Sequence, residues 1–112
     1  MARPKPGAVH AALDRIDPLI HAPARLKIVT QLYVVDAADA TFLVNQTGLT
    51  WGNLATHVAK LEEGGYVRVE KGFRGKVPCT MLSLTRQGRS AFKEYRATMQ
   101  RALADLPGSD RR

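Results

Sequence analysis

The stretch GLTWGNLATHVAKLEEGGY, residues 48–66, decides the fold predicted from this sequence. Thr50 is a residue type that caps helix N-termini, and the pair Gly64 and Gly65 is typical of a helix end. Between these caps, three apolar residues recur at intervals of four and three: Leu54, Val58 and Leu61. The spacing predicts a helix that buries one narrow apolar stripe.

A shorter helix is predicted immediately before this one. The spacing of Phe42 and Leu43 indicates a helix that starts at Thr41, and Gly48 stands where a helix commonly ends. The chain thus has a short helix, a three-residue turn that contains glycine, and a helix over residues 50–63 with a thin buried stripe. This arrangement is the helix-turn-helix pattern.

The face of helix 50–63 opposite its apolar stripe has an unusual composition. It carries small or hydrogen-bonding residues and one cation near its end: Gly52, Asn53, Thr56, Ala59 and Lys60. The helix has no acidic residue before Glu62. An ordinary solvated helix face would be rich in Glu and Lys, so this face suits a polyanionic partner.

The residues before this motif predict an arm and two helices. Residues 1–10 contain two prolines, a glycine and two basic groups, and we expect a flexible arm. Apolar residues then recur at helical spacing over residues 11–20, although Pro18 limits the regularity of that helix. A second helix is predicted to start at Pro23 and run to about Val35, and residues 36–39 are interpreted as a turn.

The residues after the motif predict a hairpin and a long helix. Residues 66–70 and 81–84 alternate between apolar and polar types, which is typical of strands. Between them, residues 71–76 interleave two glycines with three cations, Lys71, Arg74 and Lys76. Such a tip suits contact with a phosphate backbone or a narrow minor groove. A terminal helix is predicted from Thr85 to about Leu106.

The positive charge of the protein is concentrated in its second half. The chain of 112 residues has 17 Lys and Arg and 10 Asp and Glu, a net charge of +7. Residues 1–49 carry five basic and four acidic side chains, residues 50–104 carry ten and four, and residues 105–112 are neutral overall. The excess of six positive charges therefore lies on the predicted helix-turn-helix, hairpin and terminal helix, where it favours a polyanionic partner.

Several classes of protein are disfavoured by composition. Cys79 is the single cysteine, so a disulfide framework and a Cys-based zinc site are excluded, and a reducing cytoplasm fits best. The basic N-terminus is not followed by an apolar run, and no segment approaches the ~20 apolar residues of a membrane span. The acidic and histidine residues form no catalytic arrangement, so we expect a cytoplasmic protein that is not an enzyme and needs no cofactor or metal.

The order and spacing of these segments resemble the winged helix-turn-helix domain of small MarR/ArsR-like transcriptional regulators. The resemblance spans roughly residues 13–105, and it rests on the stretches 23–28, 48–66, 73–78 and 84–89. It implies a mainly α fold with a small antiparallel β wing, built from a three-helix core, a β-hairpin wing and a long C-terminal dimerisation helix. The winged helix domain with its terminal dimerisation helices would then span residues 11–106, followed by a disordered tail over residues 107–112.

The resemblance also implies a function in DNA binding. Helix 50–63 would lie in the major groove, and the wing, residues 71–76, would contact the DNA backbone or the minor groove. The protein would act as a homodimeric, sequence-specific regulator on a pseudo-palindromic site in double-stranded DNA. The DNA-contacting residues expected on this basis are Thr50, Trp51, Gly52, Asn53, Thr56, His57, Lys60, Lys71, Arg74, Gly75 and Lys76.

Dimerisation is expected from the apolar residues of the terminal segments. The last helix carries more apolar residues than one small core can cover, and the resemblance pairs the first and last helices with those of a second subunit. The expected interface consists of Leu13, Ile16, Ile20, Phe92, Tyr95, Met99, Leu103 and Leu106.

Some residues have a second interpretation. His57 lies at the edge of the buried stripe, where it either makes a structural hydrogen bond or contacts DNA. Trp51 either stacks on the sugar-phosphate backbone or braces the domain. Cys79 is interpreted as a small core residue in a strand, with a peroxide-sensing thiol as the alternative. Arg25 is expected to pair with an acidic neighbour inside the domain.

Three further alternatives concern the whole protein. The same fold could serve as a protein- or RNA-interaction module without operator specificity, although the cationic wing and acid-free recognition face favour DNA. ArsR-type metal sensors carry clusters of Cys and His ligands that this sequence lacks, so metal sensing is unsupported. Larger MarR proteins frame an effector pocket with extra helices, and a chain of 112 residues leaves little room for one.

Overall fold

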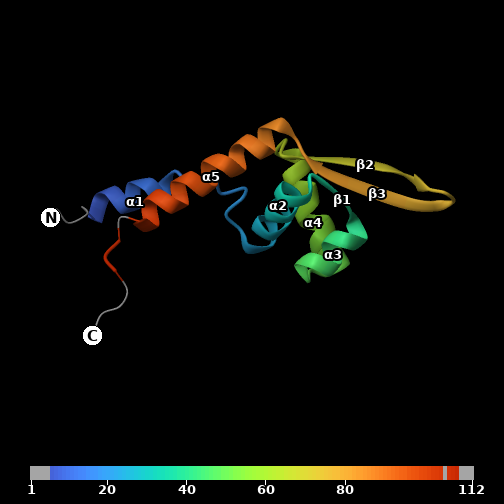
Figure 1. Ribbon diagram of the computed structural model, residues 1–112, viewed down its shortest axis with the longest axis horizontal. Coiled ribbons are helices and arrows are strands. Elements are labelled where there is room, and N and C mark those ends of the chain that lie inside the picture. The colour runs from blue at the N-terminus through green and yellow to red at the C-terminus, as the bar shows by residue number, and fades with distance from the viewer. Residues whose placement is uncertain (1–5, 105, 109–112) are drawn as a thin grey trace.

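The computed structural model describes residues 6–104 and 106–108, which form five helices and three strands (Figure 1). The elements in chain order are α1 (Pro6–Asp14), α2 (Pro23–Val35), β1 (Ala37–Asp39), α3 (Ala40–Thr47), α4 (Trp51–Glu63), β2 (Val67–Arg74), β3 (Val77–Leu84) and α5 (Arg86–Ala104). The predicted fold, a mainly α winged helix with a small antiparallel sheet, is confirmed.

The helix-turn-helix forms as its sequence predicts. The hydroxyl of Thr50 accepts a hydrogen bond of 3.1 Å from the backbone N–H of Asn53 and so caps α4. Gly48 ends α3 in the left-handed conformation at φ 73°, with its N–H bonded to Val44 O. The stripe of Leu54, Val58 and Leu61 is buried. The other face of α4 is thereby fixed toward solvent.

Helix α2 supplies the centre of the core. Its Ile28, Val29 and Leu32 are completely buried. Side chains from the other helices and from the base of the sheet pack around them: Ile20, Leu43, Leu54, Val58, Leu61, Val67, Leu82, Phe92 and Tyr95. Since every helix of the helix-turn-helix contacts this cluster, the core holds α4 in a fixed orientation relative to the sheet.

Strands β2 and β3 form a continuous antiparallel hairpin that extends beyond the helices (Figure 1). The register runs from Val67 opposite Leu84 to Arg74 opposite Val77, and Gly75 turns the chain at φ 65°. The strands are longer than predicted, because the stretch from Lys71 to Arg74 continues strand β2 instead of forming an irregular tip. Cross-strand hydrogen bonding outweighs the low strand propensity of its glycine and cations.

The predicted turn over residues 36–39 is wrong. Ala37–Asp39 forms strand β1, which pairs with Ser83–Met81 on the free edge of β3 and gives the strand order β1-β3-β2. The direction of the chain changes at Asp36 alone, which has φ 69° and follows α2. A three-residue strand has no alternation to detect, and this one is defined by pairing with residues more than 40 positions away.

The predicted helix over residues 11–20 is also misplaced. Helix α1 begins at Pro6, within the segment expected to be an arm, and ends at Asp14. Proline is tolerated in a first helical turn, because its missing N–H needs no partner there. After α1, the carboxylate of Asp17 accepts the N–H of Leu19 at 2.9 Å, and Pro18 has no N–H to give. Asp17 and Pro18 therefore form a turn in the stretch where the spacing of apolar residues predicts a helix. Residues 1–5 of the expected arm lie outside the described residues.

Helix α5 is capped by Thr85, whose hydroxyl accepts from the N–H of Gly88 at 2.9 Å and donates to Gly65 O at 2.6 Å. The helix ends at Ala104 instead of Leu106. Helix α1 packs along its C-terminal half, away from the helix-turn-helix (Figure 1). The molecule is therefore elongated, with the paired terminal helices at one end and the wing at the other.

Four residues expected at a dimer interface belong to the core of the single chain. Ile16, Ile20, Phe92 and Tyr95 are buried within one chain. The ring of Tyr33 in α2 packs against Phe92 with centroids 4.9 Å apart, so α2 covers this part of α5. The apolar stripe in the first half of α5 thus packs against its own domain. Because all four residues are buried inside one chain, they are not accessible to a second subunit.

Candidate nucleic-acid interface

The exposed face of α4 carries the side chains predicted to contact DNA. Thr50, Trp51, Gly52, Asn53, Thr56 and Lys60 are all exposed, and His57 is half-buried. Donor and acceptor groups therefore line the first two turns of the helix, and the cation of Lys60 follows in the third. No acidic side chain occurs on α4 before Glu62. Such a face can donate to phosphates and to base edges without electrostatic repulsion.

His57 connects α4 to α2 through Arg25. The guanidinium Nη1 of Arg25 lies 3.2 Å from Nδ1 of His57, its Nε donates to Leu19 O at 2.6 Å, and its Nη2 reaches Pro18 O at 3.4 Å. The expectation that Arg25 pairs with an acidic neighbour is wrong, because backbone carbonyls and a ring nitrogen take that place. Burial, then the charges of Arg25 and Lys60, lower the pKa of His57.

The wing presents its three cations to solvent. Lys71, Arg74 and Lys76 are exposed, and Gly75 lies between two of them at the tip. Phe73 is 74% exposed, which gives the wing an apolar side chain beside its cations. An extended hairpin with these groups can enter a groove or lie along a backbone.

A hollow of about 370 Å³ lies where the wing meets α4 and α3. Trp51, which is 56% exposed, lines it together with Arg74 and strand β3. Arg74 Nη2 lies 3.5 Å from Asp39 Oδ2, and the other oxygen of this carboxylate accepts the N–H of Phe42 at 2.7 Å and caps α3. The first turn of α4 and the wing arginine therefore share one surface. Neither the role of Asp39 nor its position could be inferred before β1 was known.

Cys79 also lines this hollow, half-buried on β3. The expectation that Cys79 is a small core residue is wrong, because the buried core includes Leu82 of this strand but not Cys79. Among the residues that the structure describes, no group of three or more His, Cys, Asp or Glu side chains could hold a metal ion.

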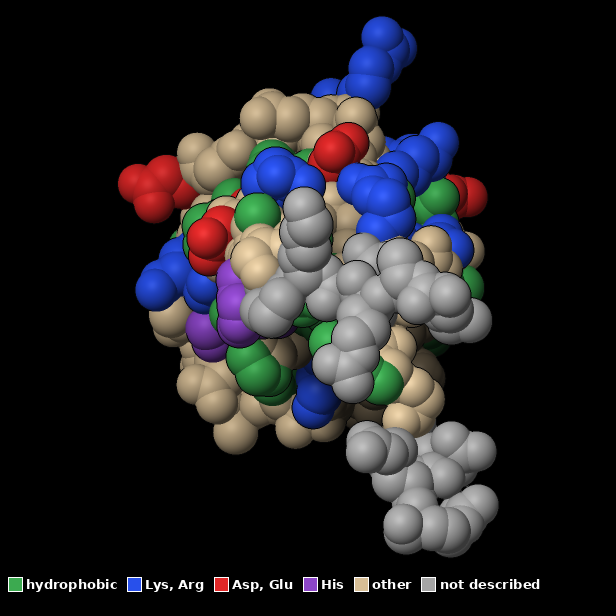
Figure 2. Space-filling view, turned by 90° about the vertical axis from the view of Figure 1, so that its left-hand side faces the viewer, with side chains coloured by type: hydrophobic (Ala, Val, Ile, Leu, Met, Phe, Trp, Pro, Cys, Tyr) green, Lys and Arg blue, Asp and Glu red, His purple; other side chains and the backbone are tan. Residues whose placement is uncertain are grey.

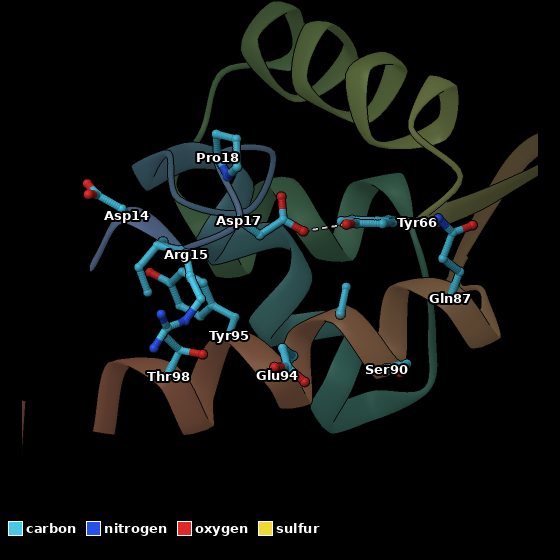
Figure 3. A pocket seen from close by; sticks show the side chains of 12 residues that line it. Asp14, Arg15, Asp17, Pro18, Tyr66, Gln87, Ser90, Glu94, Tyr95 and Thr98 are labelled. Carbon is cyan, nitrogen blue, oxygen red and sulfur yellow. Dashed lines mark hydrogen bonds between the residues drawn. The ribbon is translucent and has the colours of Figure 1, made fainter. Parts of the chain in front are cut away.

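A second, larger hollow of about 630 Å³ opens between the turn after α1 and helix α5 (Figure 3). The hydroxyl of Tyr66 donates to Asp17 across it, and Glu94, Tyr95 and Thr98 line its floor. Burial, the hydrogen bond and the charge of Asp17 raise the pKa of Tyr66 to about 12. The hollow is open to solvent, and it is formed because the turn after α1 lies over α5.

The comparisons with known proteins identify the class to which this fold and surface belong. Residues 24–103 match the model of the winged helix DNA-binding domain, and the chain belongs to this family. An uncharacterized protein from Methanocaldococcus jannaschii is 37% identical over 78 residues, which are 69% of this chain and 84% of that protein.

Solved structures share the fold. A transcriptional regulator homologue from Pyrococcus horikoshii OT3 superposes with a TM-score of 0.80 at 22% identity, over 91% of this chain and 99% of that one. A MarR-family transcriptional regulator from Silicibacter pomeroyi superposes with a TM-score of 0.63 at 19% identity, over 87% and 65% of the two chains. The expected resemblance to this group is confirmed. In the part of the chain that the structure describes, no helix is long and apolar enough to cross a membrane.

Proposed function

We propose that the protein is a transcriptional regulator that binds specific double-stranded DNA sites as a homodimer. The observation that carries this proposal is the shared surface of Trp51 and Arg74, which brings the start of α4 together with an arginine of the wing. On this surface α4 enters the major groove, and the wing lies on the backbone or in the adjacent minor groove.

The side chains divide into two roles. Asn53 and Thr56 lie on the exposed face near the start of α4, where an amide pairs with adenine and a methyl group contacts thymine. The cations Lys60, Lys71, Arg74 and Lys76 neutralise phosphates, a contribution that depends on salt and not on sequence. Trp51 is exposed at the first turn, which favours stacking against the sugar-phosphate backbone over bracing the domain.

The dimer forms at the end opposite the wing. Leu13, Leu103 and Leu106 are 38%, 55% and 48% exposed there. Figure 2 looks onto this end and shows apolar side chains at the surface among basic ones. A second copy related by a twofold axis would cover these leucines and present two recognition helices to half-sites about one helical turn apart.

Binding of variants to duplex DNA tests the proposal. Asn53→Ala is expected to relax base preference in a selection from random-sequence duplexes by losing about 1–3 kcal/mol of discrimination at one position. Arg74→Ala is expected to weaken binding to all sequences and to reduce the slope of log affinity against log salt by about 1.

Arg101→Ala serves as the matched control, because Arg101 is an exposed cation near the end of α5, far from α4 and the wing. Equal loss of affinity in Arg101→Ala and Arg74→Ala would show that the wing has no special role. Absence of binding by the wild-type protein to any duplex at low salt would contradict the proposed function as a whole.

A further inference from the structure

The bond between Arg25 and His57 has a chemical consequence for helix α4, the helix proposed to enter the major groove. A guanidinium has five N–H donors and no acceptor, and it stays protonated in proteins. The contact of 3.2 Å between Arg25 Nη1 and His57 Nδ1 is therefore a hydrogen bond only if Nδ1 carries no proton. The proton of the neutral ring must then lie on Nε2.

Arg25 is held in place for this task by the turn between α1 and α2. Its Nε and Nη2 donate to the carbonyl oxygens of Leu19 and Pro18, at 2.6 and 3.4 Å. Three of its donors thus point in fixed directions, and only one of them faces the recognition helix. Because the guanidinium is planar, fixing two donors also fixes the direction of the third.

The other ring nitrogen reaches the surface. No described residue forms a hydrogen bond with Nε2 of His57, and no buried side-chain nitrogen or oxygen among the described, non-exposed residues lacks a partner. Nε2 therefore contacts solvent. His57 follows Thr56 on α4 and precedes Lys60 by three residues, so its free nitrogen lies within the surface assigned to DNA.

We propose that Arg25 is a positioning residue that locks His57 in its neutral Nε2–H form, so that this histidine gives α4 one uncharged hydrogen-bond donor directed at DNA. The DNA contact rests on the proposed function, whereas the locked tautomer is a property of the free protein. The charged groups that face the ring are Arg25 from α2 and Lys60 from α4, and both oppose its protonation. The two interpretations of His57 from the sequence are then both realised, one at each nitrogen.

NMR of the free, full-length protein tests the locked tautomer directly. The ¹⁵N shifts of an imidazole distinguish a protonated from an unprotonated nitrogen. We expect His57 to carry its proton on Nε2 alone and to resist protonation as the pH falls below ~6.5, the ordinary pKa of histidine. In Arg25→Met, which removes the donor and keeps an apolar stem, we expect a mixture of tautomers and a higher pKa. A proton on Nδ1, or an imidazolium at neutral pH, in the wild-type protein would overturn the proposal.

Binding measurements test the donor. The probe is the duplex that the wild-type protein enriches from a random-sequence pool. His57→Gln keeps a neutral donor close to the position of Nε2, and it should bind within about twofold of wild type with the same salt dependence. His57→Leu lacks the donor and should bind about 2- to 10-fold more weakly. Lys60→Gln should instead reduce the salt slope by about 1.

The two readouts separate the possible failures. Equal binding by His57→Gln and His57→Leu, with the locked tautomer seen by NMR, would overturn the DNA contact. Failure of the wild-type protein to bind any duplex would overturn the proposed function together with that contact, while the NMR result alone would decide the tautomer. If Arg25→Met loosens the turn and lowers stability, the two His57 variants still test the donor, because the bond from Arg25 to the turn is intact in them.

Discussion

At the scale of single residues, Gly88 shows how closely α5 approaches the sheet. A Cβ added at Gly88 would overlap the carbonyl oxygen of Tyr66, a backbone atom that cannot move aside freely. This carbonyl accepts the N–H of Thr85 at 3.0 Å, so the residue before β2 is also bonded to the residue that caps α5. The glycine is thus required by the close approach of two backbones.

Gly88→Ala is therefore expected to lower the free energy of unfolding by about 1–3 kcal/mol. Gly52→Ala is the matched control in a helix, because an added Cβ at Gly52 meets nothing within 4 Å. It is expected to raise stability by about 0.5–1 kcal/mol through lower chain entropy in the unfolded state. Denaturant unfolding of both variants measures the difference, and equal stabilities would refute the close approach.

Tyr66 makes the stability of the protein depend on pH in the alkaline range. Its folded-state pKa of about 12 lies above the ordinary value of 10, so the folded state holds this proton more tightly than the unfolded state does. The stability that results is fully present below pH 10 and is lost as the pH rises from 10 to 12. Tyr66→Phe should remove this component of the decline.

The measurement is the free energy of unfolding at a series of pH values, for wild type and Tyr66→Phe. The difference between the two curves should narrow above pH 10, because the wild-type protein alone loses the bond from Tyr66 to Asp17. Parallel curves over the whole range would mean that the Tyr66 hydroxyl has the same pKa in both states.

At the scale of elements, Asp39 joins strand β1, helix α3 and the wing. One oxygen caps α3 and the other pairs with Arg74. The two functions can be separated, because Asn caps helices as well as Asp does but carries no charge. A surface ion pair contributes about 0–1 kcal/mol, so most of the stability at this site comes from the cap.

Asp39→Ala is expected to destabilise the protein by about 1 kcal/mol, whereas Asp39→Asn should leave the free energy of unfolding almost unchanged. Asp39→Asn should also bind duplex DNA more tightly than wild type, because Arg74 no longer has a competing carboxylate. Thermal unfolding and DNA titration measure the two effects. If Asp39→Asn and Asp39→Ala lose stability equally, the helix cap does not contribute most of the stability at this site.

Much of the element pattern follows from local sequence, and the failures have a common cause. Thr50, Gly48 and Thr85 act on backbone groups within a few residues, so the ends of α3, α4 and α5 could be predicted. Strand β1 could not be predicted, because the strand with which it pairs, β3, lies more than 40 residues away in the sequence. The candidate site likewise has a part that follows from local sequence and a part that depends on tertiary packing. The exposed face of α4 follows from periodicity, but Arg25 meets His57 only after α2 and α4 have packed.

At the scale of the whole molecule, the spacing of apolar residues on α5 does not tell which of them belong to the core of the chain and which are available to an interface. Phe92 and Tyr95 satisfy the same spacing as Met99 and Leu103, but the first two lie under α2 and the turn after α1. Among the described residues, only α1 and the last turns of α5 cover the apolar side chains at the end opposite the wing. Leu103 is therefore the sharper probe of self-association.

Leu103→Glu is expected to give a monomer by light scattering at concentrations where the wild-type protein is a dimer, because a charge would be buried in the proposed interface. Val34→Glu is the control, since Val34 is an equally apolar, highly exposed residue on α2. Both variants should fold normally. A wild-type monomer at all concentrations, or dimers in both variants, would contradict the proposed interface.

The burial of Ile20, Phe92 and Tyr95 inside one chain means that a single copy already holds a complete hydrophobic core. The proposed association with a second copy would then follow folding as a separate equilibrium, governed by concentration. For a regulator that is monomeric when dilute and occupies its site as a pair, occupancy rises with the square of the protein concentration. The response to a twofold change in expression would be up to fourfold, so the cooperativity of the switch would come from mass action alone.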